Sequence, residues 1–146
     1  MAIRIVQLGS SRDPAEGLRL GTVRFPPRGV PKGELAARDF YDVWLPILAP
    51  TAELIRTVRA GGDTAWRRFS REFAMQMRAP EAARTLDLLA ALSHHTNLSI
   101  GCYCDDEARC HRSILRQLLL EREALIASAR GRRGGLPVVR GSRGRT

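Results

Sequence analysis

The chain contains no apolar run long enough to cross a bilayer, which takes about 20 consecutive apolar residues. Its first residues, MAIRIVQLG, alternate apolar and polar side chains and lack the apolar segment and small-residue cleavage site of a secretory signal. Membrane insertion and secretion are therefore not expected, and the sequence favours a cytoplasmic protein.

Cysteine is also scarce, with three in the chain, all between Cys102 and Cys110. An odd number within so short a stretch argues against the disulfide framework of a small secreted protein, so free thiols in a reducing compartment are expected. The 146 residues are 44% hydrophobic, which suits one domain with its own core.

Lysine is nearly absent, since Lys32 is the only one, and yet the net charge is +9. Six of the arginines lie in the last segment, RGRRGGLPVVRGSRGRT, which has no acid; without these six charges the +9 falls to +3. We therefore expect a domain over 1–129 and a flexible Arg/Gly-rich tail over 130–146. Such a tail is either an electrostatic arm for phosphates or a solvated end without a role.

Hydrophobic periodicity predicts strands mixed with helices. Short apolar runs predict strands at 3–9, 18–25 and 97–104. Amphipathic patterns predict helices over 34–48 with a kink near Pro46, from Thr51 to Gly61, from an Asp63 cap to Met77, from Pro80 to His95, and over 110–129. Trp66, Phe69 and Phe73 recur on one helical face and are expected in the core. The pattern indicates one three-layer α/β domain with a small, mostly parallel sheet and flanking helices.

Two polar loops are expected to share one edge of this sheet. GSSRDP follows the first strand, and CYCDDEAR follows the uncharged strand before the last helix. Ligands of open α/β sheets bind at the carboxyl ends of the strands, where both loops would lie.

The stretch GCYCDDEARCHRSIL permits a metal site, because Cys102, Cys104, Cys110 and His111 supply four soft ligands for zinc. Its spacing differs from that of familiar zinc knuckles. Adjacent helical residues such as Cys110 and His111 would also diverge by about 100°. Zinc therefore ranks below a reactive thiol and a bound phosphate as an interpretation of this stretch.

A reactive thiol is a second interpretation of the same stretch. A helix beginning near Cys110 would favour a thiolate there, Arg109, His111 and Arg112 would add positive charge, and His111 could serve as base or acid. The same helix start would suit a bound phosphate. A purely structural role also stays open, with Cys102 and Cys110 packed as small hydrophobes and Arg112 paired with Asp105 or Asp106.

Three segments resemble the domain of unknown function 488 family, also called YeaO-like, of small bacterial proteins. They are GSSRDPAEGLRLGTVRFPPRGVPKGEL, WLPILAPTAEL and CYCDDEARCHRSIL. Cys104 departs from the family pattern, and Phe25 stands where a tryptophan is common. The resemblance implies a Rossmann-like fold but no reaction, and its matching positions here are Ser11, Arg12, Arg28, Gly29, Trp44, Cys102, Cys110, His111 and Arg112.

Together these patterns favour a strand-end pocket for a phosphate-bearing ligand, either a nucleotide or a nucleic acid. Cys110 and His111 are the candidate catalytic residues. An accessory protein that binds nucleic acid through its basic tail is the alternative, and a zinc-stabilised module is a further one. The expected ligand-binding residues are Ser11, Arg12, Arg28, Cys102, Arg112 and Ser113.

Overall fold

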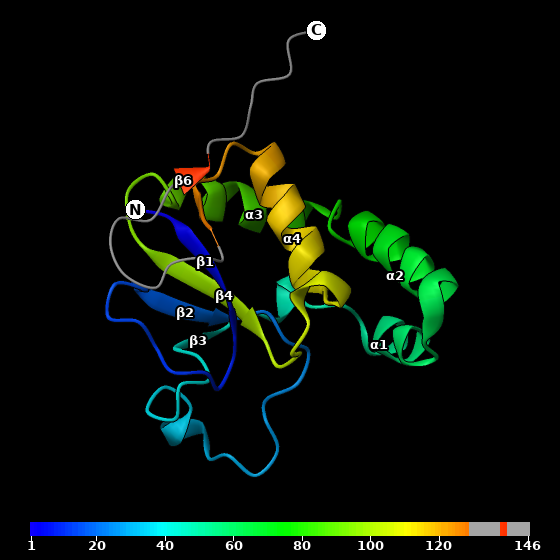
Figure 1. Ribbon diagram of the computed structural model, residues 1–146, viewed down its shortest axis with the longest axis horizontal. Helices are drawn as coiled ribbons and strands as arrows, with labels where there is room; N and C mark the ends of the chain where they lie inside the picture. The colour runs from blue at the N-terminus through cyan, green and yellow to red at the C-terminus, as the bar shows by residue number, and fades with distance from the viewer. Residues whose placement is uncertain (129–137, 140–146) are drawn as a thin grey trace, which may run out of the picture.

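A computed structural model describes residues 1–128 and the backbone of residues 138–139 (Figure 1). Its strands are β1 (Ile3–Gln7), β2 (Leu18–Gly21), β3 (Val43–Trp44), β4 (Leu98–Cys102), β5 (Ile126–Ala127) and β6 (Val138–Val139). Its α-helices are α1 (Ala52–Arg59), α2 (Gly62–Gln76), α3 (Pro80–Leu92) and α4 (His111–Glu121), and short 3₁₀ turns lie at Lys32–Glu34, Pro46–Leu48 and Glu107–Arg109.

The strands form one sheet in the order β3-β2-β4-β1-β5-β6. The first five strands of this order are parallel, and β6 pairs antiparallel with β5. β4 lies in the middle and is buried along its whole length, as expected for a parallel strand covered on both faces. The predicted α/β fold with a mostly parallel sheet is confirmed.

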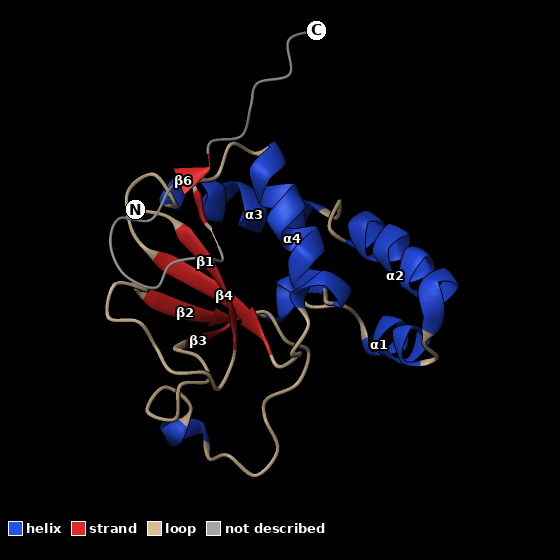
Figure 2. Ribbon diagram, viewed as in Figure 1, coloured by secondary structure: helices blue, strands red, loops and turns tan. Residues whose placement is uncertain are grey.

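The two faces of the sheet are covered differently. Ile3, Leu98 and Ile100 point to one face, where they share a core with residues of all four helices. The opposite face carries Arg19 and Ser99, and the loops around 8–17 and 35–42 pack over it. Figure 2 shows α1, α2 and α4 to one side of the strands and the long loops on the other. Helices, sheet and loops thus form a three-layer, Rossmann-like domain.

A fully buried ion pair holds the loop layer on the sheet. The Arg19 guanidinium is 0% exposed; its Nε donates to Glu16 at 2.6 Å, and its Nη1 donates to the carbonyls of Ser10 and Asp39. Glu16 also accepts the Ser99 hydroxyl at 2.7 Å. One arginine therefore joins the loop between β1 and β2 to the loop around Asp39 and, through Glu16, to β4.

Several local predictions are confirmed. The strands at β1, β2 and β4 form where expected, although each is shorter than predicted. Thr51 caps α1, because its hydroxyl accepts the backbone N–H of Leu54 at 3.2 Å. Phe69 and Phe73 are buried, and Trp66 packs against the same core.

Three other local predictions are wrong. The helix over 34–48 does not form, because Asp39 adopts φ 61°, and Val43–Trp44 instead pair with β2 as an edge strand. Asp63 is not the cap of α2, which begins one residue earlier, after Gly61 at φ 80°. The last helix ends at Glu121, not near 129, because Glu123 takes φ 61° and the chain turns back into β5.

The predicted tail over 130–146 contains β6, whose backbone at 138–139 is described; the rest of the tail lies outside the described residues. Within the described part of the chain, none of the helices has both the length and the apolar character that crossing a membrane demands.

Candidate functional site

The cysteine-rich stretch lies at the point where the chain leaves neighbouring strands in opposite directions. The connection after β2 runs outward to β3, whereas the connection after β4 crosses to β5 on the far side of β1. Such a divergence at the carboxyl ends of parallel strands is the usual place for a site in an open α/β sheet. Thr22 follows β2 there, and Cys102 is the last residue of β4.

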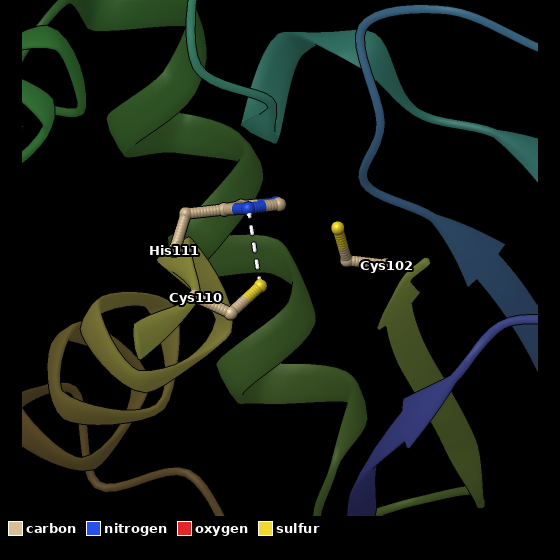
Figure 3. Close-up of side chains that lie close together, drawn as sticks. All are labelled: Cys102, Cys110 and His111. Carbon is tan, nitrogen blue, oxygen red and sulfur yellow. Dashed lines mark hydrogen bonds between the residues drawn. The ribbon is translucent and has the colours of Figure 1, made fainter. Parts of the chain in front are cut away.

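Cys110 stands immediately before α4 and is not itself helical. Its backbone is extended, with φ −124° and ψ 152°, and its side chain is only 3% exposed. The 100° separation of neighbouring helical residues therefore does not apply to Cys110 and His111. The Cys110 Sγ lies 3.5 Å from His111 Nδ1 (Figure 3).

His111 is held from its other ring nitrogen. Its Nε2 lies 2.6 Å from the carbonyl oxygen of Thr22, and its ring meets Phe73 edge to face at 5.5 Å between centroids. A carbonyl oxygen only accepts hydrogen bonds, so Nε2 carries a proton. The nitrogen with a lone pair to offer is therefore Nδ1, which faces Cys110.

The remaining cysteines lie on the strand side of the cluster. Ligand atoms of Cys102, Cys110 and His111 all lie within 4.8 Å of one another, and all three residues are buried. Figure 3 shows Cys110 and His111, at the start of α4, facing Cys102 at the end of β4. Cys104 is exposed, and its Sγ lies 3.7 Å from that of Cys102. Residues two apart along a strand share one face, which agrees with the close approach of these two sulfurs.

Arg112 points inward from the first turn of α4 and is 3% exposed. Its Nη1 donates to the carbonyl of Val6 at 2.7 Å and its Nη2 to the carbonyl of Cys104 at 2.6 Å. Its Nε donates to the Cys110 sulfur at 3.4 Å. The guanidinium thus joins β1, the turn after β4 and the cysteine cluster. The neighbouring Ser113 hydroxyl caps the Cys110 carbonyl at 2.8 Å.

The three cysteine thiols differ in pKa. Hydrogen bonds from Cys102 and Cys104, together with the contact to His111, hold the pKa of Cys110 well below its ordinary value. Hydrogen bonding to Cys104 and Cys110, together with burial, raises the pKa of Cys102. Of the three cysteines, Cys110 is thus the one whose pKa is lowered, whereas the pKa values of Cys102 and Cys104 are raised.

Comparison with known proteins places this geometry in a family. A family model described as the active DUF488-N3 subclade matches residues 3–123. The chain belongs to the DUF488 family. The matched segment contains the whole cysteine cluster and excludes the tail, and the resemblance found in the sequence is confirmed. No curated protein and no solved structure matches the chain.

The DUF488 fold brings some of the expected site residues together and leaves others apart. Cys102, Cys110, His111, Arg112 and Ser113 meet at the start of α4. Ser11 is exposed, and Arg12 binds Asp42 at 2.6 Å and Asp39 at 3.6 Å. Arg28 is exposed and pairs with none of the described residues. None of these three forms a hydrogen bond or ion pair with the cluster.

Two residues of the DUF488 site were not anticipated from sequence. Thr22 orients His111 through its carbonyl group, and its hydroxyl also donates to the carbonyl of Gly101 at 2.9 Å. Its place directly after β2 was the available signal, because that strand end faces the same edge. Phe73 was expected in the core, and no pattern in the sequence indicates that its ring also supports His111.

Proposed function

We propose that this DUF488 protein binds one zinc ion through Cys102, Cys110 and His111, with Cys104 as the fourth ligand. The spacing of the ligand atoms carries the proposal. Zinc–sulfur bonds of about 2.3 Å and zinc–nitrogen bonds of about 2.0–2.1 Å in a tetrahedron imply about 3.8 Å between two sulfurs and about 3.5 Å between sulfur and nitrogen. The corresponding distances are 3.7 Å for Cys102–Cys104 and 3.5 Å for Cys110–His111.

The surroundings of the cluster support the same ligand set. A histidine that binds a metal usually donates its other N–H to a carbonyl or carboxylate, which is the role that Thr22 plays for His111. Leu8, Val23 and Tyr41 pack around Cys102 and Cys110 and keep water from the buried side. Structural zinc sites are closed in this way.

Charge balance favours three thiolates over two. The buried Arg112 guanidinium forms no ion pair with a described carboxylate, so its charge must be balanced by the groups it contacts. Zinc with three thiolates and a neutral histidine carries one negative charge, which Arg112 neutralises. Zinc with two thiolates would leave a net positive charge in a buried site.

The proposed role of the ion is to hold the carboxyl edge of the sheet. Its ligands come from the end of β4, the turn at Cys104 and the start of α4, which are otherwise joined mainly by Arg112. Because these ligands cannot assemble in the unfolded chain, zinc affinity would add directly to the stability of the fold.

A second candidate function is thiol-dependent chemistry on a phosphate-bearing ligand, with Cys110 as nucleophile and His111 as proton carrier. It is supported by the contacts of Cys110 Sγ with Arg112 Nε and His111 Nδ1, and by the word "active" in the description of the matching subclade. Against it stands the 3% exposure of Cys110, which leaves little room for a substrate.

Metal analysis of the full chain, purified without chelator, distinguishes the two. We expect about one zinc per chain, falling to about a tenth in Cys102→Ser and Cys110→Ser, while His95→Gln, an exposed histidine, keeps the full content. Cobalt substitution should give thiolate-to-metal absorption in the near ultraviolet. Protein that is folded by circular dichroism but free of metal, with Cys110 rapidly alkylated by iodoacetamide, would replace the zinc proposal with the thiol one.

A further inference from the structure

The helical hairpin formed by α1 and α2 stands apart from the sheet. Figure 1 shows both helices at the side of the molecule away from β1, β2 and β3. One face of α2 packs inward through Trp66, Phe69, Phe73 and Met77. The Arg109 side chain binds Asp63 at 2.6 Å and lies over Trp66, which fixes the start of α2 beside the cysteine cluster. The hairpin, called the α1–α2 arm below, is therefore packed on one side and exposed on the other.

Arginine dominates the exposed side of this arm. Residues 52–78 contain six arginines and three acids. Arg67 and Arg71 are four residues apart, so they project from one side of α2, away from Phe69 and Phe73, and Arg78 lies two residues beyond the end of this helix. Arg56 and Arg59 lie on α1, and all five side chains belong to exposed residues.

These five guanidinium groups are unpaired, which sets them apart from the other arginines. None of them forms a hydrogen bond or ion pair with a residue that the structure describes. Apart from Arg28, the remaining described arginines all bind a carboxylate or a carbonyl group; Arg68, for example, pairs with Glu72 at 3.0 Å. Five of the six arginines that lack a partner among the described residues therefore lie on this arm, and Arg28 is the sixth.

We propose that the α1–α2 arm binds the phosphate backbone of double-stranded nucleic acid. With a rise of about 1.5 Å per residue, Arg67 and Arg71 are about 6 Å apart along α2, and Arg78 continues the row just beyond the end of the helix. A single small anion would contact one or two of these side chains, whereas a duplex presents a phosphate charge about every 1.7 Å along its axis. The extended row of cations therefore matches a polyanion.

The arm offers little for reading bases or entering a membrane. Phe69 and Phe73 are 3% and 0% exposed, and Trp66 stacks on Phe69 at 5.4 Å, so these rings are not available to stack on bases. The apolar face of α2 is already used in the core, and an interfacial helix would need that face for lipid. Binding should therefore be sequence-independent and strongly salt-dependent.

The test is fluorescence anisotropy of the full chain with a labelled 20-base-pair duplex between 50 and 300 mM KCl. We expect Arg67→Gln/Arg71→Gln/Arg78→Gln to weaken binding at least about tenfold at 100 mM. The slope of log affinity against log salt should fall by about 2–3, since each lost phosphate contact contributes about 0.9. The matched control, Arg28→Gln/Arg38→Gln/Arg84→Gln, removes the same charge from other exposed positions and should change affinity less than about twofold.

Both threefold variants are also made in a chain whose six tail arginines are replaced by glutamine. Duplex binding by the tail then cannot hide a loss of binding by the α1–α2 arm. Unchanged circular dichroism is expected for both threefold variants, because the arm arginines have no partners to lose and Arg38 and Arg84 lose only exposed ion pairs with Glu34 and Asp87. Equal weakening by the two threefold variants would overturn the proposal. So would absence of duplex binding at 50 mM KCl, or binding to phosphatidylserine vesicles without binding to the duplex. None of these outcomes depends on zinc, whose content is measured separately.

Discussion

His111 Nε2 lies 2.6 Å from the Thr22 carbonyl oxygen, while Nδ1 of the same ring lies 3.5 Å from the Cys110 sulfur. One ring therefore links the end of β2 to the cysteine cluster and has a different task at each nitrogen. The structural task belongs to Nε2, and any task as a ligand belongs to Nδ1. Because the two nitrogens lie at different distances along the side chain, substitutions can separate the tasks.

We expect His111→Gln and His111→Asn to differ. The glutamine amide reaches the position of Nε2 and can still donate to Thr22, but it offers no ligand to zinc. The asparagine amide reaches the position of Nδ1 and loses Thr22. Cobalt titration should show at least about tenfold weaker binding to His111→Gln than to wild type. In the presence of chelator, the melting temperature of His111→Gln should be closer to that of wild type than the melting temperature of His111→Asn is. Equal metal affinity for His111→Gln and wild type would refute the assignment of Nδ1.

The Arg112 guanidinium gives a second expectation, because it serves three acceptors from a buried position. Arg112→Gln leaves the carbonyls of Val6 and Cys104 without their hydrogen-bond donor. Each unsatisfied carbonyl lowers the free energy of unfolding by about 1–3 kcal/mol. We expect urea unfolding to show a loss of at least about 2 kcal/mol even with chelator present. Arg116→Gln is the matched control: it breaks a half-exposed pair with Glu107 and should cost less than about 1 kcal/mol.

The sequence predicted the sheet better than the layer that covers its second face. β1 and β4 could be found because apolar alternation and an uncharged run are local signals. The loop layer depends on Arg19, whose partners are Ser10 and Glu16 in the loop before β2 and Asp39 in the loop before β3. In the sequence, Arg19 is an ordinary polar residue of a short strand, and nothing local marks it as fully buried.

The candidate site was also predicted only in part, because some of its contacts leave no local signal in the sequence. Cys110, His111 and Arg112 adjoin a helix start, and Cys102 lies in the same cysteine-rich stretch, so both signals are local. Arg12 was grouped with them because its loop follows a strand end, but the carboxylates of Asp39 and Asp42 bind its guanidinium. The argument against a metal assumed that Cys110 and His111 diverge as neighbours on a helix. Cys110 instead lies just before the helix, with an extended backbone.

Gly21 provides a test of how closely the loop layer approaches the sheet. A methyl group at this position would lie 2.4 Å from Tyr41 Cδ1, and the Tyr41 ring is itself buried. We expect Gly21→Ala to destabilise the fold by about 1–3 kcal/mol through overpacking. Gly33→Ala, where a methyl group meets nothing within 4 Å, should change stability little. The two midpoints of urea unfolding are compared, and a neutral Gly21→Ala would show that the loop layer yields easily.

The Glu16–Arg19 pair predicts a pH dependence of stability whose sign follows from its pKa. Burial acts to raise the pKa of Glu16, but hydrogen bonds from Arg19, Ser99 and the Asp13 backbone outweigh it and lower the pKa from 4.5. A carboxyl group with a lowered pKa in the folded state stabilises the fold fully above its unfolded pKa. That contribution is lost as the pH falls through the folded value. The contribution of Glu16 should therefore be complete at pH 7 and decline below about 4.5.

Replacing Glu16 isolates this contribution. Glu16→Gln leaves the Arg19 charge buried without a counter-ion, so we expect a loss of about 3–5 kcal/mol at pH 7. The gap between variant and wild type should narrow from pH 5 to pH 3, because protonation removes the same charge from the wild type. Glu34→Gln, in an exposed pair with Arg38 at 3.6 Å, should lose less than about 1 kcal/mol and show no such narrowing. The free energy of unfolding of all three proteins is measured with urea at each pH. A difference between wild type and Glu16→Gln that stays constant down to pH 3 would mean that Glu16 does not carry the charge that holds Arg19.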